Sequence, residues 1–201
     1  ALLAIETALC LLLLGQVLGG NVVVLPLGEA TVWGWLFELR LAMGLLGANL
    51  SGYDLPGLGG AAYGLIMQEL ERGDSGLRSF ASVQGALVMY PIHAFGSEAQ
   101  KTHWLPRLAS GEAVGCFGLT EPDFGSNPGG MTTRAEAKDG GYVLNGAKMW
   151  ITNGDLADVA VVFAKLDGEV NGFLVERGTP GFATQEIKGK VSLRASDTAS
   201  L

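Results

Sequence analysis

Residues 117–127 read Phe-Gly-Leu-Thr-Glu-Pro-Asp-Phe-Gly-Ser-Asn, and within them an apolar run gives way to turn-forming residues. A strand that ends in such a loop exposes backbone N–H groups and hydroxyls to a ligand. Gly118 and Gly125 permit a close approach of the backbone. The stretch has neither the Gly-Lys-Ser/Thr of a Walker loop nor the GxGxxG spacing of a dinucleotide fingerprint. Composition alone leaves two alternatives, a ligand-binding loop or a turn-rich connection.

A second informative stretch, residues 150–154, reads Trp-Ile-Thr-Asn-Gly. Along an extended strand, Trp150 and Thr152 point to the same face, where the pair could hold a planar ligand. The alternative is a core tryptophan ahead of an Asn-Gly turn. The residues by themselves do not separate these interpretations.

The chain changes character near residue 112. Before it, apolar residues recur at helical spacing. The expected helices are 36–46, 61–72, 82–90 ending near Pro91, and a short one that begins with the capping-box pattern of Ser97 and Gln100 and runs through Leu105. A Gly/Pro-rich loop is expected at 52–60.

After residue 112, short apolar runs bounded by turn residues indicate strands. They are 113–119, 133–137, 142–144, 149–152, 159–165, 172–175 and 183–187, with a hairpin turn at Asp139-Gly140-Gly141. The predicted fold class is α+β. A helical domain is expected over residues 1–111 and a small β-barrel domain over residues 112–201.

The composition supports a folded core, because 48% of the residues are hydrophobic and 16% are charged. The formal net charge is −7 and no basic run is present, so nucleic-acid binding has little support. Cys10 and Cys116 have no CxxC partner and are interpreted as buried thiols in a reducing compartment. His93 and His103 have no Cys or carboxylate at ligand spacing, and we expect no metal site.

The segment Ala1–Leu18 is almost continuously apolar. A membrane helix or a secretory signal is one interpretation of such a run. Glu6 lies inside it and no basic residue precedes it, which favours a core helix of a helical bundle. We therefore expect no membrane association.

Together, residues 117–127 and 150–153 resemble the two flavin-binding motifs of acyl-CoA dehydrogenases, in the same order and at a similar separation. The likeness runs from about Leu45 to Thr198. It implies a helical N-terminal domain, a middle β-barrel, a C-terminal helical domain missing from this chain, and FAD as the cofactor. The FAD-binding residues that it implies are Phe117, Gly118, Leu119, Thr120, Glu121, Pro122, Gly125, Ser126, Trp150, Ile151 and Thr152.

The resemblance also implies individual roles for some of these residues. Thr120 would lie near the pyrimidine edge of the flavin, and Ser126 would also contact the acyl-CoA. Trp150 would lie against the isoalloxazine ring. The Thr152 hydroxyl would reach flavin N5, where a hydrogen bond helps to hold negative charge in the reduced ring. Asn127 stands where the family has Asp.

Residues 69–79 resemble the acyl pocket of the glutaryl-CoA dehydrogenases, and residues 83–84, 87–89 and 192–196 agree with that subfamily. The resemblance implies that Arg78 and Ser79 hold the distal carboxylate of a glutaryl group, with Glu71 nearby. An arginine fork suits this task because it can pair with a carboxylate at two points. On the residues alone, the alternative is a surface network of acidic side chains and Arg at a helix end.

The function implied is flavin-dependent α,β-dehydrogenation of an acyl-CoA to the enoyl-CoA, with glutaryl-CoA as the expected substrate. The resemblance places no catalytic residue in this chain, because the glutamate base is expected beyond Leu201. The 201-residue chain is therefore expected to be inactive by itself. The alternatives are another acyl-CoA dehydrogenase or oxidase, or a non-catalytic flavin-binding or assembly protein.

The same resemblance implies the partners and the location. The partners are the acyl-CoA substrate, an electron-transfer flavoprotein and further copies of the chain in a homo-oligomer. The location is the bacterial cytoplasm or the mitochondrial matrix. The first 44 residues fit the family poorly, since they lack charged helix faces.

Overall fold

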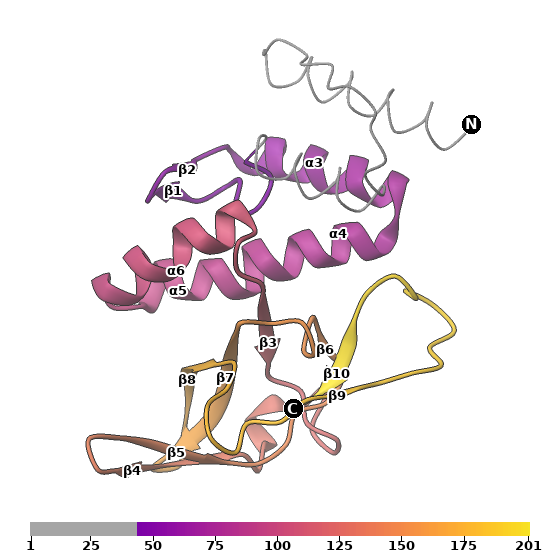
Figure 1. Cartoon of the computed structure of the whole chain (residues 1–201). Coiled ribbons are helices and arrows are strands. Elements are labelled where there is room, and N and C mark those ends of the chain that lie inside the picture. The colour runs from indigo at the N-terminus through magenta and orange to yellow at the C-terminus, as the bar shows by residue number, and fades with distance from the viewer. Residues whose placement is uncertain (1–43) are drawn as a thin grey trace.

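The structure, a computed structural model, describes residues 44–201. The helices pack together at one end of the molecule and the strands lie at the other, with β3 (Gly115–Gly118) running from the first region into the second (Figure 1). This confirms the predicted helical region followed by a β region. The predictions for Ala1–Leu18, for Cys10 and for residues 36–43 lie outside the described residues.

The helix predicted at 61–72 is confirmed as α3 (Gly60–Gly73). The one predicted at 82–90 is longer at both ends. It begins as α4 (Ser75–Ser82), because Asp74 caps it by accepting hydrogen bonds from the N–H groups of Gly76 and Leu77. It continues through the π-helix η1 (Val83–Met89) into α5 (Tyr90–Phe95), so Pro91 does not end it.

The predicted capping box is confirmed at the start of α6 (Glu98–Ser110), where Ser97 and Gln100 exchange hydrogen bonds. The helix runs past Leu105 because burial of Trp104, Leu105 and Leu108 favours its continuation. Leu46, expected in a helix, lies in a turn. The expected loop at 52–60 includes part of a two-stranded ribbon, formed by β1 (Ser51–Gly52) and β2 (Leu55–Pro56).

Besides the β1–β2 ribbon, the described strands form two sheets. The larger has the order β3-β7-β4-β5, with β8 also paired to β7, and the smaller has the order β6-β10-β9. Both β3 and β4 run parallel to β7, which simple hairpin connections cannot produce. The remaining bounds are η2 (Pro128–Gly130), β4 (Arg134–Lys138), β5 (Gly141–Asn145), β6 (Ile151–Thr152), β7 (Val159–Leu166), β8 (Glu169–Glu176), β9 (Gln185–Glu186) and β10 (Thr198–Ser200).

The predicted hairpin around Asp139-Gly140-Gly141 is confirmed as β4 and β5. Asp139 and Gly140 have φ angles of 50° and 78°, as the turn of a tight hairpin requires.

Strand β7 is buried on both faces, which places it between two cores. Val159 and Val161 pack with the helical core of Leu46, Met89, Ile92, Leu105 and Leu108. Ala160 and Val162 pack on the opposite side with Cys116, Ile151 and Ala157. Cys116 is a buried thiol, as predicted, and burial raises its pKa to about 12.

A buried amide links the helices to β3. The Gln84 side chain donates from Nε2 to the carbonyl oxygens of Leu108 (2.9 Å) and Ala113 (2.8 Å). Its Oε1 accepts from the Gly115 N–H at 2.9 Å. Gln84 therefore sets where β3 begins relative to α6, and β3 leads directly into the loop at residues 119–127.

Within residues 44–201, no helix is both long and apolar enough to cross a membrane. The same residues contain no group of three or more His, Cys, Asp or Glu side chains arranged to hold a metal ion.

Candidate functional site

The loop after β3 is a short turn with an exposed tip. Glu121 and Phe124 exchange two backbone hydrogen bonds, each of 3.2 Å, which close the turn. Pro122 is exposed at its tip, and Gly125 and Ser126 are exposed beyond it. This segment therefore presents backbone and small side chains to solvent, as a ligand-binding loop requires.

Trp150 has an unusual conformation immediately before β6. Its φ angle is 64°, in the left-handed region, and 56% of its surface is exposed. That conformation costs a non-glycine residue about 1–2 kcal/mol. Trp150 and Thr152 were predicted to share a face of an extended strand. That prediction is wrong, because Trp150 is not extended and β6 begins only at Ile151. The chain holds a large exposed ring in a costly conformation, which is typical of functional sites.

The two stretches singled out in the sequence lie side by side. The Met149 N–H donates to the Thr120 carbonyl at 2.9 Å. The Lys148 Nζ donates to the Leu119 carbonyl at 3.1 Å. A Cβ atom on Gly118 would lie 3.4 Å from Lys148 Cγ, so this position permits the close approach of the lysine stem. The loop after β3 and the segment leading into β6 thus form one unit.

The Glu121 side chain points into the protein rather than toward solvent. Its carboxylate accepts from the N–H and hydroxyl of Thr132, the N–H and hydroxyl of Thr133, and Lys148 Nζ. Burial alone would raise the pKa of Glu121, but the hydrogen bonds from Thr133, Thr132 and Lys148 outweigh it and hold the pKa well below its usual range. The carboxylate is therefore ionised and fully engaged in internal contacts.

Lys148 is the partner that sequence reasoning missed. Its Nζ lies 2.9 Å from Glu121 Oε1, and both side chains are only 2% exposed. Burial lowers the pKa of Lys148, and the hydrogen bond and charge of Glu121 oppose that shift. The sequence indicated this pair only by a lysine directly before the Met-Trp-Ile run. The carboxylate that pairs with the lysine belongs to Glu121, 27 residues earlier in the chain.

Three hydroxyls in the unit have the chemistry that a polar ligand needs. The side chains of Thr120, Ser126 and Thr152 make no hydrogen bond to any other group in the described part of the chain. Thr120 and Thr152 are half-buried and Ser126 is exposed. Donors of this kind, on the same unit as an exposed tryptophan ring, suit a flat heterocycle with polar edges, as in a flavin.

Two other predicted site residues pack against the two cores. The Phe117 ring is partly buried and packs on Phe163, with ring centroids 5.0 Å apart, on the side of the helical core. Ile151 is buried in the core on the other side of β7. Any contact of Ile151 with a ligand would therefore come from its backbone.

The predicted carboxylate-binding residues lie where α3 meets α4. Arg78 Nε donates to Glu71 Oε2 at 2.6 Å, and Ser75 Oγ donates to Glu71 Oε1 at 2.6 Å. The hydrogen bond from Arg78, followed by that from Ser75, lowers the pKa of Glu71. Ser79 is half-buried, and its hydroxyl makes no hydrogen bond within the described residues. The structure therefore brings Arg78 to Glu71, as the sequence predicted.

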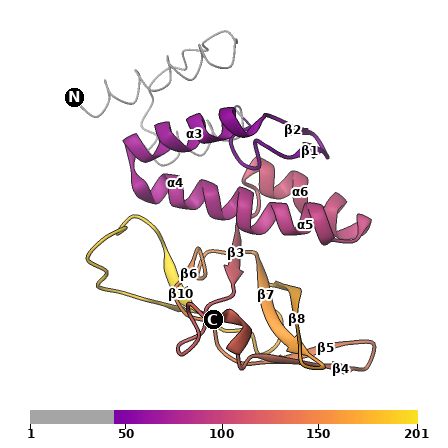
Figure 2. The same ribbon diagram turned by 180° about the vertical axis from the view of Figure 1, so that it is seen from behind.

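The segment between β9 and β10 reaches back to the start of α4, as both views show (Figures 1 and 2). A Cβ atom on Gly76 would lie 3.1 Å from Ala195 Cβ, so the two backbones are in close contact. Lys190 holds this segment together by donating to the Leu193 and Ser196 carbonyls and to Thr198 Oγ1. Residues 192–196, which agreed with the glutaryl subfamily in sequence, therefore lie beside the helix that carries Arg78.

Four of the carboxylates that lie near the predicted site residues in sequence are engaged in contacts of their own. Asp74 caps α4, Glu69 pairs with Arg72 and Glu71 pairs with Arg78. Glu121 is buried with a lowered pKa, which makes it a poor proton acceptor.

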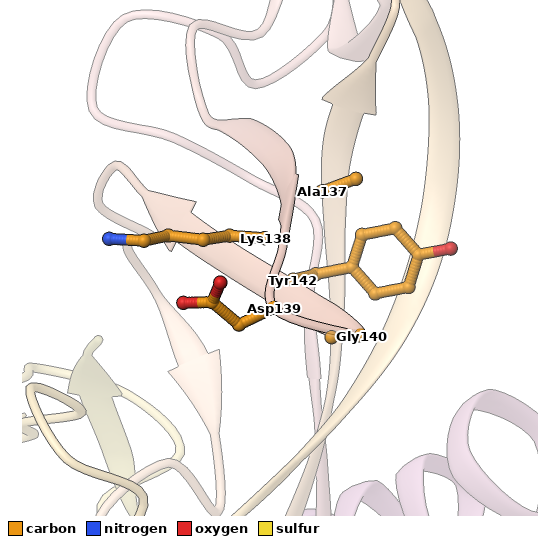
Figure 3. Close-up of a pocket in the computed structure, with 6 residues that line it drawn as sticks. Ala137, Lys138, Asp139, Gly140 and Tyr142 are labelled. Carbon is orange, nitrogen blue, oxygen red and sulfur yellow. The ribbon is translucent and has the colours of Figure 1, made fainter.

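Two surface hollows within residues 44–201 do not coincide with the predicted flavin residues. One of about 420 Å³ lies at the β4–β5 turn, where Lys138 and Asp139 point one way and Tyr142 the other (Figure 3). The other, of about 470 Å³, is lined by residues from 155 to 198 on the β9–β10 side. Side chains that diverge as in Figure 3 do not converge on a ligand.

Comparisons with known proteins identify the family. Residues 32–112 match the family model described as acyl-CoA dehydrogenase, N-terminal domain, and residues 116–201 match the one described as acyl-CoA dehydrogenase, middle domain. The human mitochondrial short-chain specific acyl-CoA dehydrogenase is 40% identical over 177 residues, which are 83% of this chain and 43% of that protein.

Solved structures are also similar. A glutaryl-CoA dehydrogenase from Mycobacterium smegmatis in complex with FADH2 is 58% identical with a TM-score of 0.79, over 83% of this chain and 43% of that one. A chain in the structure described as the electron-transferring flavoprotein of Acidaminococcus fermentans is 36% identical with a TM-score of 0.78, over 83% of this chain and 46% of that one. This chain thus spans less than half the length of these relatives. With family models matched over both of its regions, the chain belongs to the acyl-CoA dehydrogenase family.

Proposed function

We propose that this chain supplies part of an FAD site in an acyl-CoA dehydrogenase. The observation that carries the proposal is that the segment of the exposed Trp150 ring and of Thr152 is joined by hydrogen bonds to the segment of Thr120. The similarity to an enzyme described with bound FADH2 supports the same cofactor. Ser126 and the backbone of residues 117–122, 125 and 151 complete the proposed FAD-binding set.

FAD, when bound, supplies the acceptor for the hydride that leaves the β-carbon of the acyl group. The residues of this chain bind and orient the cofactor and the acyl-CoA. Trp150 covers one side of the site and excludes water. The Thr152 hydroxyl donates a hydrogen bond to the flavin, and this bond strengthens as the ring gains negative charge. Ser126 binds the acyl-CoA as well. The base that removes the α-proton is a glutamate that none of these residues provides.

We propose glutaryl-CoA as the substrate. Arg78 and Glu71 form a pair that is 36% and 46% exposed, so a ligand carboxylate can approach the guanidinium from solvent. Ser79, one residue on, has a hydroxyl to donate. The high identity to a glutaryl-CoA dehydrogenase supports this assignment.

The second candidate is a short-chain acyl-CoA without a distal carboxylate. The similarity to a short-chain specific enzyme favours it. In that case the Arg78–Glu71 pair is a surface contact at a helix junction and takes no part in substrate recognition.

The remaining parts of the proposal concern partners and location. An electron-transfer flavoprotein would reoxidise the flavin, a homo-oligomer would complete the FAD site, and the protein would work in a bacterial cytoplasm or a mitochondrial matrix. The similarity to a chain described with an electron-transferring flavoprotein supports the first of these.

The test is substrate discrimination by the full protein with FAD. Arg78→Ala should cost about 2–5 kcal/mol in kcat/KM on glutaryl-CoA, as for loss of one partner of a charged pair, and should change butyryl-CoA oxidation little. Arg72→Ala is the matched control, since Arg72 lies at the same junction and pairs with Glu69. Equal losses on both substrates would support the short-chain alternative instead.

A further inference from the structure

The buried pair of Lys148 and Glu121 lies between the two proposed flavin-binding segments. Lys148 is two residues before Trp150, and Glu121 follows Thr120 directly. Lys148 Nζ donates both to the Glu121 carboxylate (2.9 Å) and to the Leu119 carbonyl (3.1 Å). One ammonium group therefore contacts the residues on both sides of Thr120, in addition to the single backbone bond from Met149 to Thr120.

The pair is also anchored on its outer sides. Glu121 accepts from Thr132 and Thr133 just before β4. The backbone of Lys148 exchanges two hydrogen bonds of 2.9 Å with Leu201, next to β10. Neither segment can shift without breaking buried charged contacts, since a buried charge that loses its partner is costly.

The two charges are not equally replaceable. Without Lys148, the Glu121 carboxylate keeps the four donors of Thr132 and Thr133. Without Glu121, the Lys148 ammonium keeps the Leu119 carbonyl and a 3.9 Å contact to the Met131 sulfur. The carboxylate therefore orders the turn, and the ammonium joins that turn to the segment of Trp150.

We propose that Lys148 and Glu121 are positioning residues that fix the separation of Thr120 from Trp150 and Thr152, and so the orientation of the bound flavin. The inference rests on the proposed FAD function. Neither side chain touches the cofactor, because both are buried inside the unit. Their effect is transmitted through the Leu119 carbonyl and the backbone on either side of it.

The experiment compares Lys148→Met, Glu121→Gln and the double variant in the full protein. Lys188→Met is the control, because Lys188 forms an exposed pair with Glu186 on the same region. The FAD dissociation constant comes from quenching of FAD fluorescence, the orientation of bound flavin from its visible circular dichroism, and stability from the thermal midpoint.

Lys148→Met should lower the thermal midpoint, weaken FAD binding about tenfold or more and change the circular dichroism of the flavin. The double variant contains no unpaired buried charge, so it should regain stability relative to either single variant. It should not regain FAD affinity or the flavin spectrum, because the bond to the Leu119 carbonyl is still missing. Lys188→Met should match the parent throughout.

Two results overturn the inference while the parent still binds FAD. One is a Lys148→Met variant with unchanged FAD affinity and flavin spectrum. The other is recovery of affinity and stability together in the double variant, which indicates a purely structural pair. If the parent protein itself leaves FAD fluorescence unquenched, the proposed function fails and this inference fails with it.

Discussion

Two of the glutamates that pair with cations, Glu71 and Glu121, form pairs that differ in almost every respect except charge. Glu71 and Arg78 are 2.6 Å apart and 46% and 36% exposed. Glu121 and Lys148 are slightly farther apart at 2.9 Å, yet both are only 2% exposed. Distance is therefore a poor guide to strength, because solvent screens the shorter pair and cannot reach the longer one.

The difference also matches two kinds of task. A half-exposed arginine can exchange its internal carboxylate for a ligand carboxylate at little cost. A buried lysine cannot exchange partners without leaving a charge unpaired in the interior. The first pair is suited to a substrate that arrives and leaves, and the second to a spacing that must stay constant.

The largest expected effect is on stability. Glu121→Ala should lower the free energy of unfolding by about 3–5 kcal/mol, since it leaves Lys148 buried without its carboxylate. Glu71→Ala should leave the urea unfolding curve of the full protein where it is, because water replaces the lost contact. A Glu71→Ala loss as large as that of Glu121→Ala would remove the distinction between the two pairs.

A smaller loss in the free energy of unfolding is expected when the buried contact that is removed carries no charge. Gln84→Leu keeps a similar volume but removes the side-chain partner of the Gly115 N–H and of the Ala113 carbonyl. The Leu108 carbonyl keeps only the N–H of Gly111, at 3.3 Å. The loss should be about 1–3 kcal/mol, below that of Glu121→Ala. Hydrogen exchange at the Gly115 amide should accelerate as well. The exposed Gln68→Leu is the control, and a Gln84→Leu protein as stable as that control would show that the buried amide contributes nothing.

The smallest effect concerns salt. The pKa of Glu71 lies below its ordinary value because of Arg78 and Ser75. Salt weakens the charge-dependent part of this shift, since the Debye length falls to about 3 Å at 1 M. In NMR titrations the pKa of Glu71 should therefore rise toward the ordinary value between low and high salt. At both salt concentrations, Glu121 should stay ionised at the pH values where Glu71 titrates. A Glu121 pKa at the ordinary value for glutamate would contradict its burial in the pair.

Sequence reasoning succeeded where the determining contacts are local. The Ser97 capping box and the β4–β5 hairpin depend on residues a few positions apart, and both are confirmed. Glu71 and Arg78 are seven residues apart, and a motif carried both. Contacts between residues a few positions apart can be predicted from one sequence, because both partners belong to the same local motif.

It failed where partners are distant in the chain. Nothing near Lys148 or Gln84 in sequence indicates their partners, which lie 17 or more and 24 or more residues away. The parallel pairing of β3 with β7 was missed for the same reason. The early start of α4 was missed because the capping residue Asp74 was interpreted as part of an acyl-pocket segment.

The pairing of Lys148 with Leu201 has a consequence for the order of events during synthesis. The helical region makes mostly short-range contacts and can fold soon after it leaves the ribosome. The two proposed flavin-binding segments cannot be fixed until β7 and then Leu201 have emerged, because β3 pairs with the first and Lys148 with the second. Until β7 emerges, the buried strand β3 lacks its pairing partner, so a nascent chain is prone to aggregate in this interval.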